Sequence, residues 1–329
     1  MRASLKYNKQ KGVALITALL IVALAAAAAA WLTNTHQLSI RRSGNLINGD
    51  QAYAYALGLE ALAIAALNED FKQQGGNTTD GFSDVWAVGI APFPVPGGMV
   101  SGRVIDLQGL FNLNSLFQGG KIQPVPLARF RTLLRYLELD DELANAVIDW
   151  LDADTNPYGP SGAEDDYYTG LERPYRTANG PFTSVSELRM VKGFDVKQFD
   201  ALSAALSALP VGTPINVNTA PAAVHIAIGA SEAVAEALDQ NPDPAETATE
   251  PEAPNPAQPK TQVEFDSIDD YVTFPGMQNI DKTDLALTSS YFLFEGEARI
   301  DRGYSLIKTI LYRDNSGNMR VVMRSQGTL

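Results

Sequence analysis

Carboxylate side chains are concentrated between residues 149 and 166, where six acidic residues fall within 18 positions. Asp152, Asp154 and Asn156 alternate along the chain, a spacing by which a loop turns successive oxygens to the same side. The run Glu164-Asp165-Asp166 repels itself unless a cation neutralises it. Calcium needs six to eight hard oxygen ligands, commonly from flexible loops, and is the metal that this composition favours.

Two other interpretations of this acidic stretch stay open. It can be a solvated acidic loop, or it can hold a pair of catalytic carboxylates. It is not an EF-hand, because the glycine and glutamate that an EF-hand loop requires at its sixth and twelfth positions do not follow.

Composition restricts the chemistry further. The chain has no cysteine and only two histidines, which argues against thiolate sites, disulfides and histidine-based catalysis or zinc binding. With 25 basic and 38 acidic residues the net charge is −13, so the surface repels phosphates and no nucleic-acid partner is expected.

The acidic stretch belongs to a chain that begins with a membrane anchor. A short basic segment, which includes Lys9 and Lys11, precedes an apolar run over residues 13–32. Twenty helical residues span about 30 Å, the thickness of a bilayer core. The positive charges predict a cytoplasmic N-terminus with the remainder outside. The run can be a plain anchor, or a secretory signal cut near the alanines at 25–30.

A third interpretation depends on the sequence KGVALIT over residues 11–17, which resembles a type IV prepilin leader. In that family a membrane peptidase cuts after the glycine and methylates the new N-terminus, which implies cleavage between Gly12 and Val13. Most members have glutamate at the fifth mature position. Thr17 stands there instead, and the lack of that glutamate is a feature of the K-type minor pseudopilins.

The patterns beyond the anchor predict an α+β fold: a long pilin-like N-terminal helix with an antiparallel β-sheet head, interrupted by a large inserted α-helical domain. Strands are expected near residue 100 and over 291–300, 306–312 and 320–324, and helices between them, including one over 196–209. Residues 182–194, 214–221 and 265–277 resemble SAM-like or helix-hairpin-helix units. Residues 239–260, rich in proline and acids, are expected to be a flexible loop.

The expected domains follow the chain in this order: a leader over 1–12, the membrane and packing helix over 13–74, the first part of the β head over 75–114, a first SAM-like part with the acidic loop over 115–213, a second SAM-like part over 214–287, and strands that complete the head over 288–329.

Three stretches resemble, in order, the minor pseudopilin K family of type II secretion systems: FNLN at 111–114, the acidic region DWLDAD at 149–154 with GAEDDYY at 162–168, and PINVNTA at 214–220. The resemblance implies a region that binds two calcium ions, with weaker candidate ligands at Asp149 and at carbonyls near 177–179. It transfers the ligand role to Asp152, Asp154, Asn156, Glu164, Asp165 and Asp166.

The resemblance also implies a structural function. Such a protein is anchored in the inner membrane by one helix and has its C-terminal domain in the periplasm. It forms the tip of the pseudopilus and starts fibre assembly for protein secretion across the outer membrane. The implied partners are the I- and J-type minor pseudopilins, the H-type and major pseudopilins, and prepilin peptidase. The alternative is a membrane-anchored periplasmic metal-dependent hydrolase.

Overall fold

The computed structural model describes residues 13–73, 79–240, 263–277 and 280–327. A single continuous helix, α1 (Val13–Gln73), occupies the first of these ranges. At about 1.5 Å per residue its 61 residues extend roughly 90 Å. Gly44 and Gly49 do not interrupt it, although glycine weakens helices in solution. The predicted leader, residues 1–12, lies outside the described residues.

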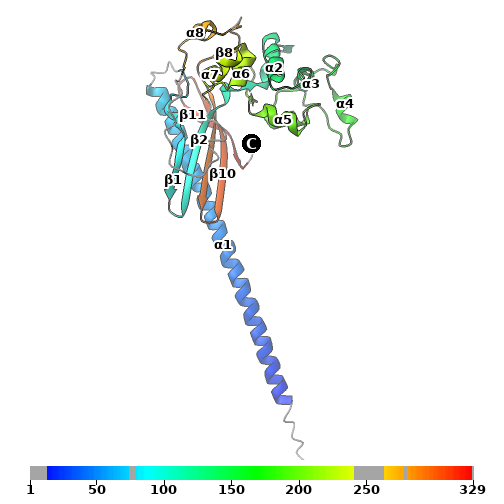
Figure 1. Ribbon diagram of the computed structural model, residues 1–329. Coiled ribbons are helices and arrows are strands. Elements are labelled where there is room, and N and C mark those ends of the chain that lie inside the picture. The colour runs from blue at the N-terminus through cyan, green and yellow to red at the C-terminus, as the bar shows by residue number, and fades with distance from the viewer. Residues whose placement is uncertain (1–12, 74–78, 241–262, 278–279, 328–329) are drawn as a thin grey trace, which may run out of the picture.

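The C-terminal half of α1 packs on an antiparallel sheet (Figure 1). The strand order is β1-β2-β9-β10-β11, and the strands are β1 (Ile90–Val95), β2 (Gly98–Asp106), β9 (Tyr291–Ile300), β10 (Gly303–Arg313) and β11 (Met319–Gln326). In β9 and β10 buried residues alternate with more exposed ones, because one face of the sheet covers the helix. The core between helix and sheet includes Leu59, Leu67, Trp86, Phe292 and Phe294.

Between β2 and β9 the chain leaves the sheet and forms a second, mainly helical domain with its own core. Its helices are α2 (Pro124–Tyr136), α3 (Leu143–Leu151), α4 (Asp165–Thr169), α5 (Val196–Ser203), α6 (Ala222–Ile228), α7 (Glu232–Leu238) and α8 (Ile268–Thr273). Its short strands are β3 (Phe111–Asn112), β4 (Phe117–Gln118), β5 (Lys121–Ile122), β6 (Leu206–Ser207), β7 (Ile215–Asn216) and β8 (Leu285–Ala286).

Short 3-10 helices complete the described elements: η1 (Val85–Val88), η2 (Leu107–Gly109), η3 (Leu113–Leu116) and η4 (Val185–Met190). The predicted fold class is therefore confirmed: a long N-terminal helix, an antiparallel sheet and a helical insertion. The part of the proline- and acid-rich insert between 241 and 260 lies outside the described residues.

One predicted helix is wrong in its extent. We expected a helix over 196–209, but α5 ends at Ser203 and Leu206–Ser207 forms β6, which pairs in parallel with β3. The side chain of Asn112 also accepts a hydrogen bond from the backbone of Leu209 at 3.0 Å. These contacts with a segment about a hundred residues away outweigh the local helix propensity.

The helical domain lies beyond the end of the sheet that is farther from the N-terminus of α1 (Figure 1). A buried polar network fixes this junction. Asp106, at the end of β2, accepts hydrogen bonds from Gln108 N (2.8 Å), Asn216 Nδ2 (2.9 Å), Thr219 Oγ1 (2.6 Å) and Ser289 Oγ (2.5 Å). Because these donors come from both domains, the network holds the insert in one orientation on the head.

Candidate metal centre

Three of the predicted ligands meet where α3 ends and α4 begins. Asp152 follows the last residue of α3, Asp154 stands in the loop, and Glu164 directly precedes α4. One carboxylate oxygen from each residue can be chosen so that all three lie within 4.8 Å of one another. The fold thus brings Glu164 to Asp152 and Asp154, which precede it by twelve and ten positions, and in the described part of the chain no basic side chain is paired with any of the three.

Two of these acids are buried, and within the described part of the chain each has at least one carboxylate oxygen without a hydrogen-bond partner. Asp152 is 8% exposed and Glu164 is 3% exposed. Among the described residues, Asp152 Oδ1 and both carboxylate oxygens of Glu164 have no hydrogen-bond partner. Buried polar atoms are rarely left in this state, because the desolvation cost is then not offset. The oxygens are therefore placed as ligands for a cation would be.

Burial and mutual repulsion disturb the ionisation of both groups. Burial raises the pKa of Glu164 to about 7, with further contributions from the charges of Asp149, Asp152 and Asp154. Burial likewise raises the pKa of Asp152 to about 6, and the charges of Asp154 and Asp149 add to the effect. A bound divalent cation reverses this effect, since it stabilises the ionised carboxylates.

The loop between Asp152 and Glu164 is anchored from two sides. Asp149, buried in α3, accepts hydrogen bonds from Tyr158 N at 2.8 Å and Ala163 N at 2.5 Å. Lys192 Nζ donates to the carbonyl of Gly162 at 3.0 Å. Because both carboxylate oxygens of Asp149 accept hydrogen bonds from backbone amides of the loop, Asp149 stabilises the loop conformation.

The other predicted ligands lie beside this cluster of three acids and make the following contacts. Asp165 accepts hydrogen bonds from the backbone and hydroxyl of Thr177, at 3.1 and 3.0 Å, and lies 3.4 Å from Arg176. Asp166 is exposed on α4. Asn156 donates from its backbone and side chain to Asp154 Oδ1, at 2.7 and 3.1 Å.

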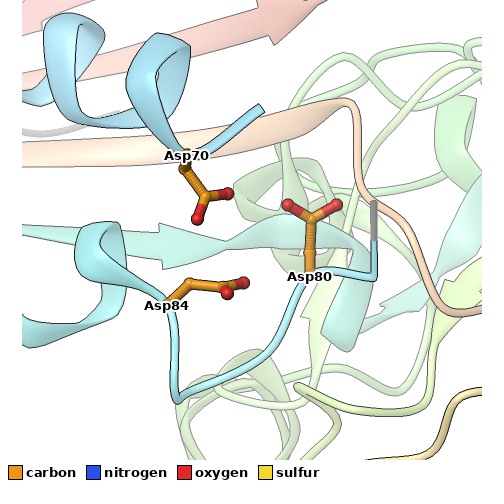
Figure 2. Close-up of side chains that lie close together, drawn as sticks. All are labelled: Asp70, Asp80 and Asp84. Carbon is orange, nitrogen blue, oxygen red and sulfur yellow. The ribbon is translucent and has the colours of Figure 1, made fainter. Parts of the chain in front are cut away.

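A second acidic cluster was not predicted from the sequence. Asp70 near the end of α1, Asp80 and Asp84 point toward one another (Figure 2), with oxygens within 4.8 Å. The guanidinium of Arg313 already supplies a positive charge to this cluster. Arg313 donates from Nη2 to both oxygens of Asp80, and its Nη1 lies 3.9 Å from Asp70 Oδ2. We therefore regard only the Asp152–Asp154–Glu164 cluster as a candidate metal centre.

The membrane anchor is the second feature that bears on function. Over the described residues, α1 is the helix long and apolar enough to cross a membrane, and its apolar window has no residue buried against the rest of the chain. Val13 begins the helix and Thr17 lies in its first turns. Gly12, the other residue of the predicted cleavage site, lies outside the described residues.

Comparisons with known proteins agree with this architecture. The model of a family described as "Type II secretion system (T2SS), protein K" matches residues 109–211. A type II secretion system protein K from Pseudomonas aeruginosa is 38% identical over 328 residues, covering 97% of this chain and 93% of that protein. One from Aeromonas hydrophila is 40% identical over 226 residues, covering 64% of this chain and 68% of that protein.

A solved structure shares the fold. A chain of "The Crystal Structure of the GspK-GspI-GspJ complex from enterotoxigenic Escherichia coli Type 2 Secretion System" superposes with a TM-score of 0.72 at 23% identity, covering 88% of this chain and 100% of that one. The identity to the Pseudomonas protein extends over nearly all of both sequences. This chain belongs to the type II secretion system protein K family of minor pseudopilins.

Proposed function

We propose that this minor pseudopilin caps the tip of the type II secretion pseudopilus and starts its assembly, in a complex with I- and J-type minor pseudopilins. The observation that carries the proposal is the position of the helical insert. It lies beyond the sheet, at the end away from the membrane-anchoring part of α1 (Figure 1). In a fibre whose subunits align their helices, a domain in that position occupies the space of a subunit stacked above.

The orientation of the head on α1 supports the same arrangement. Near the middle of the helix, the backbone of Asn48 lies against Gly303, where an added Cβ would come within 2.4 Å of it. Near the C-terminal end, Asp70 lies beside Arg313. The sheet therefore follows the helix axis, and the insert leaves from its distal end, which suits a cap.

Thr17 supports a terminal position. Its hydroxyl lies 3.0 Å from the carbonyl oxygens of both Val13 and Ala14, to which it can donate a hydrogen bond within α1. The side chain is thus satisfied inside its own helix and carries no charge that requires a neighbour's amine in the bilayer. A subunit of this kind needs no related subunit on its distal side in the fibre. The H-type and major pseudopilins would then be added on its membrane side.

Processing belongs to the proposal. Prepilin peptidase would cut between Gly12 and Val13 and methylate the new N-terminus, leaving a single inner-membrane helix with the C-terminal domain in the periplasm. The apolar helix supports the anchor. Mass analysis of the N-terminus from a host with prepilin peptidase tests the cut. A mature chain that begins at Val13 agrees with it, and one that begins near Ala30 contradicts it.

We also propose that calcium binds between α3 and α4 and has a structural role. The orphaned oxygens of Asp152 and Glu164 support this, and Asp154 supplies a third carboxylate. When bound, the cation would offset the repulsion among the three acids and hold the loop to α4. The number of two ions, and the participation of Asn156, Asp165 and Asp166, remain predictions from the family resemblance.

Co-purification tests the central proposal. Full-length protein in detergent is expected to retain I- and J-type minor pseudopilins from the same secretion system through a tag on this chain alone. Failure to retain either contradicts the proposal. The alternative hydrolase is not favoured, because the relatives are named as components of a secretion system.

A further inference from the structure

The two edges of the five-stranded sheet differ in their capacity to accept another strand. Edge strand β1 contains Pro92 and Pro94, which have no N–H group to extend a hydrogen-bond ladder. Edge strand β11 contains no proline over its eight residues, and in the described part of the chain it pairs with β10 alone. The β11 edge is therefore the one on which strand addition is chemically possible.

This edge also exposes apolar side chains. Val322 is 54% exposed, and Val321 and Met323 are each 39% exposed. Val322 is the extra residue of a bulge, because Leu311 pairs with Val321 and Ile310 with Met323. Exposed apolar edge strands favour pairing with another chain, while a bulge restricts which strands fit. The β11 edge can therefore accept another strand, but the bulge limits which strands fit.

Charge indicates what kind of strand fits. Arg320 is exposed and its guanidinium lies 4.5 Å from the centre of the Tyr312 ring, while Arg324 pairs with Glu60 of α1. Antiparallel pairing of two copies of β11 about Val322 would place Arg320 opposite Arg324. Like charges directly opposite each other destabilise a sheet, so a second copy of this chain is disfavoured in that register. A strand with an acidic side chain opposite Arg320 is favoured instead.

The position of β11 beside α1 restricts the partner further. Arg324 Nη2 lies 2.6 Å from Glu60 Oε1, so this edge lies next to the helix that continues into the membrane. A chain that adds a strand here can align its own membrane helix with α1. Exposed apolar residues of α1 outside the predicted span, among them Leu46 and Ile47, are available to contact such a helix.

We propose that the β11 edge accepts a strand from a neighbouring membrane-anchored minor pseudopilin, with an acidic residue of that strand opposite Arg320. This inference rests on the proposed function and adds to it the surface that recognises the partner. Backbone hydrogen bonds supply the attraction, and the arginine and the bulge select the partner strand.

The test compares Val322→Lys with Val88→Lys, since Val88 is an 80% exposed valine of η1, away from β11. Full-length variants in detergent are titrated with purified I- and J-type minor pseudopilins. Val322→Lys is expected to weaken binding of one of them by about tenfold or more, an energy of at least about 1.4 kcal/mol, with Val88→Lys unchanged. Equal binding by both variants overturns the inference. No binding by the unmodified protein contradicts the proposed function and this inference with it.

A cross-linking experiment keeps the proposal falsifiable if Val322→Lys unfolds. The chain contains no cysteine, so Val322→Cys introduces a unique thiol for a short photoactivatable cross-linker. The cross-linked peptide of the partner is expected to come from an edge strand with a neighbouring Asp or Glu. A cross-link confined to the partner's helix, or one of equal yield from Val88→Cys, overturns the inference.

Discussion

The guanidinium of Arg313 donates hydrogen bonds to both carboxylate oxygens of Asp80, a residue 233 positions earlier in the chain. Both residues are buried, and Arg313 Nη2 also donates to the carbonyl of Ser289 at 2.7 Å. Ser289 in turn donates to Asp106, the centre of the network between the two domains. The ion pair therefore connects the end of the sheet to the position of the helical insert.

Removal of this arginine is expected to destabilise the protein strongly. Arg313→Met leaves the Asp80 carboxylate buried without its cation, which should cost about 3–5 kcal/mol in the free energy of unfolding. Denaturant unfolding of the detergent-solubilised protein measures this. Arg302→Met, at an exposed arginine of the β9–β10 turn, is the control and should change stability by less than about 0.5 kcal/mol. Adding Asp80→Asn to Arg313→Met should recover part of the loss. A similar, small effect of both arginine substitutions would contradict the importance of the pair.

Calcium is expected to raise the melting temperature, and a chelator is expected to lower it. At a free calcium concentration one hundred times Kd the gain is about 2.7 kcal/mol. Glu164→Gln should remove most of the calcium response, because it replaces a carboxylate whose two oxygens have no hydrogen-bond partner among the residues that the structure describes. Glu236→Gln, at an exposed glutamate of α7 outside the predicted ligand set, is the matched control and should keep the calcium response. Thermal unfolding with and without chelator decides the matter, and an unchanged calcium response in Glu164→Gln would exclude Glu164 as a ligand.

The raised pKa of Glu164 sets a pH dependence with a definite sign. Because burial and nearby acids raise the pKa to about 7, the group favours the folded, calcium-free state when it is protonated. That contribution is fully present below the usual glutamate pKa and is lost as pH rises through about 7. The calcium-free protein should therefore lose stability relative to Glu164→Gln between pH 5 and 8, whereas calcium affinity should rise over the same range. Parallel pH profiles of the two proteins would contradict the assignment.

Local patterns predicted much of this structure, and long-range contacts account for what they missed. The apolar run and the helix formers after it predicted α1, and alternation predicted Tyr291–Ile300 as a strand. The helix expected over 196–209 failed because β6 pairs with β3, a contact with a distant segment that periodicity does not reveal. The partnership of Asp80 with Arg313 was invisible for the same reason.

The acidic loop illustrates a different limit. Its composition was compatible with calcium, and the family resemblance favoured it, but Asp149, Asp152 and Asp165 have the same side chain, so composition alone could not assign different roles to them. The structure distinguishes them by their partners. Asp149 accepts hydrogen bonds from two backbone amides, and Asp165 accepts one from the backbone amide of Thr177. Asp152 has one carboxylate oxygen with no hydrogen-bond partner among the described residues. Asp152 therefore offers a carboxylate oxygen to a cation, whereas both oxygens of Asp149 already accept hydrogen bonds.

This difference between support and ligand gives the last prediction. Asp149→Asn should destabilise the protein even in chelator, because one amide oxygen cannot replace two carboxylate oxygens that accept from Tyr158 N and Ala163 N. Loss of a hydrogen bond that leaves a buried donor unsatisfied costs about 1–3 kcal/mol. Glu164→Gln, by contrast, should leave the chelated protein as stable as the unmodified one, or more so, near pH 8, since it removes a buried charge. Thermal unfolding in chelator, followed by calcium titration calorimetry, separates the two effects. If Asp149→Asn melts normally in chelator and loses only calcium binding, Asp149 is a ligand and the loop is held by the metal alone.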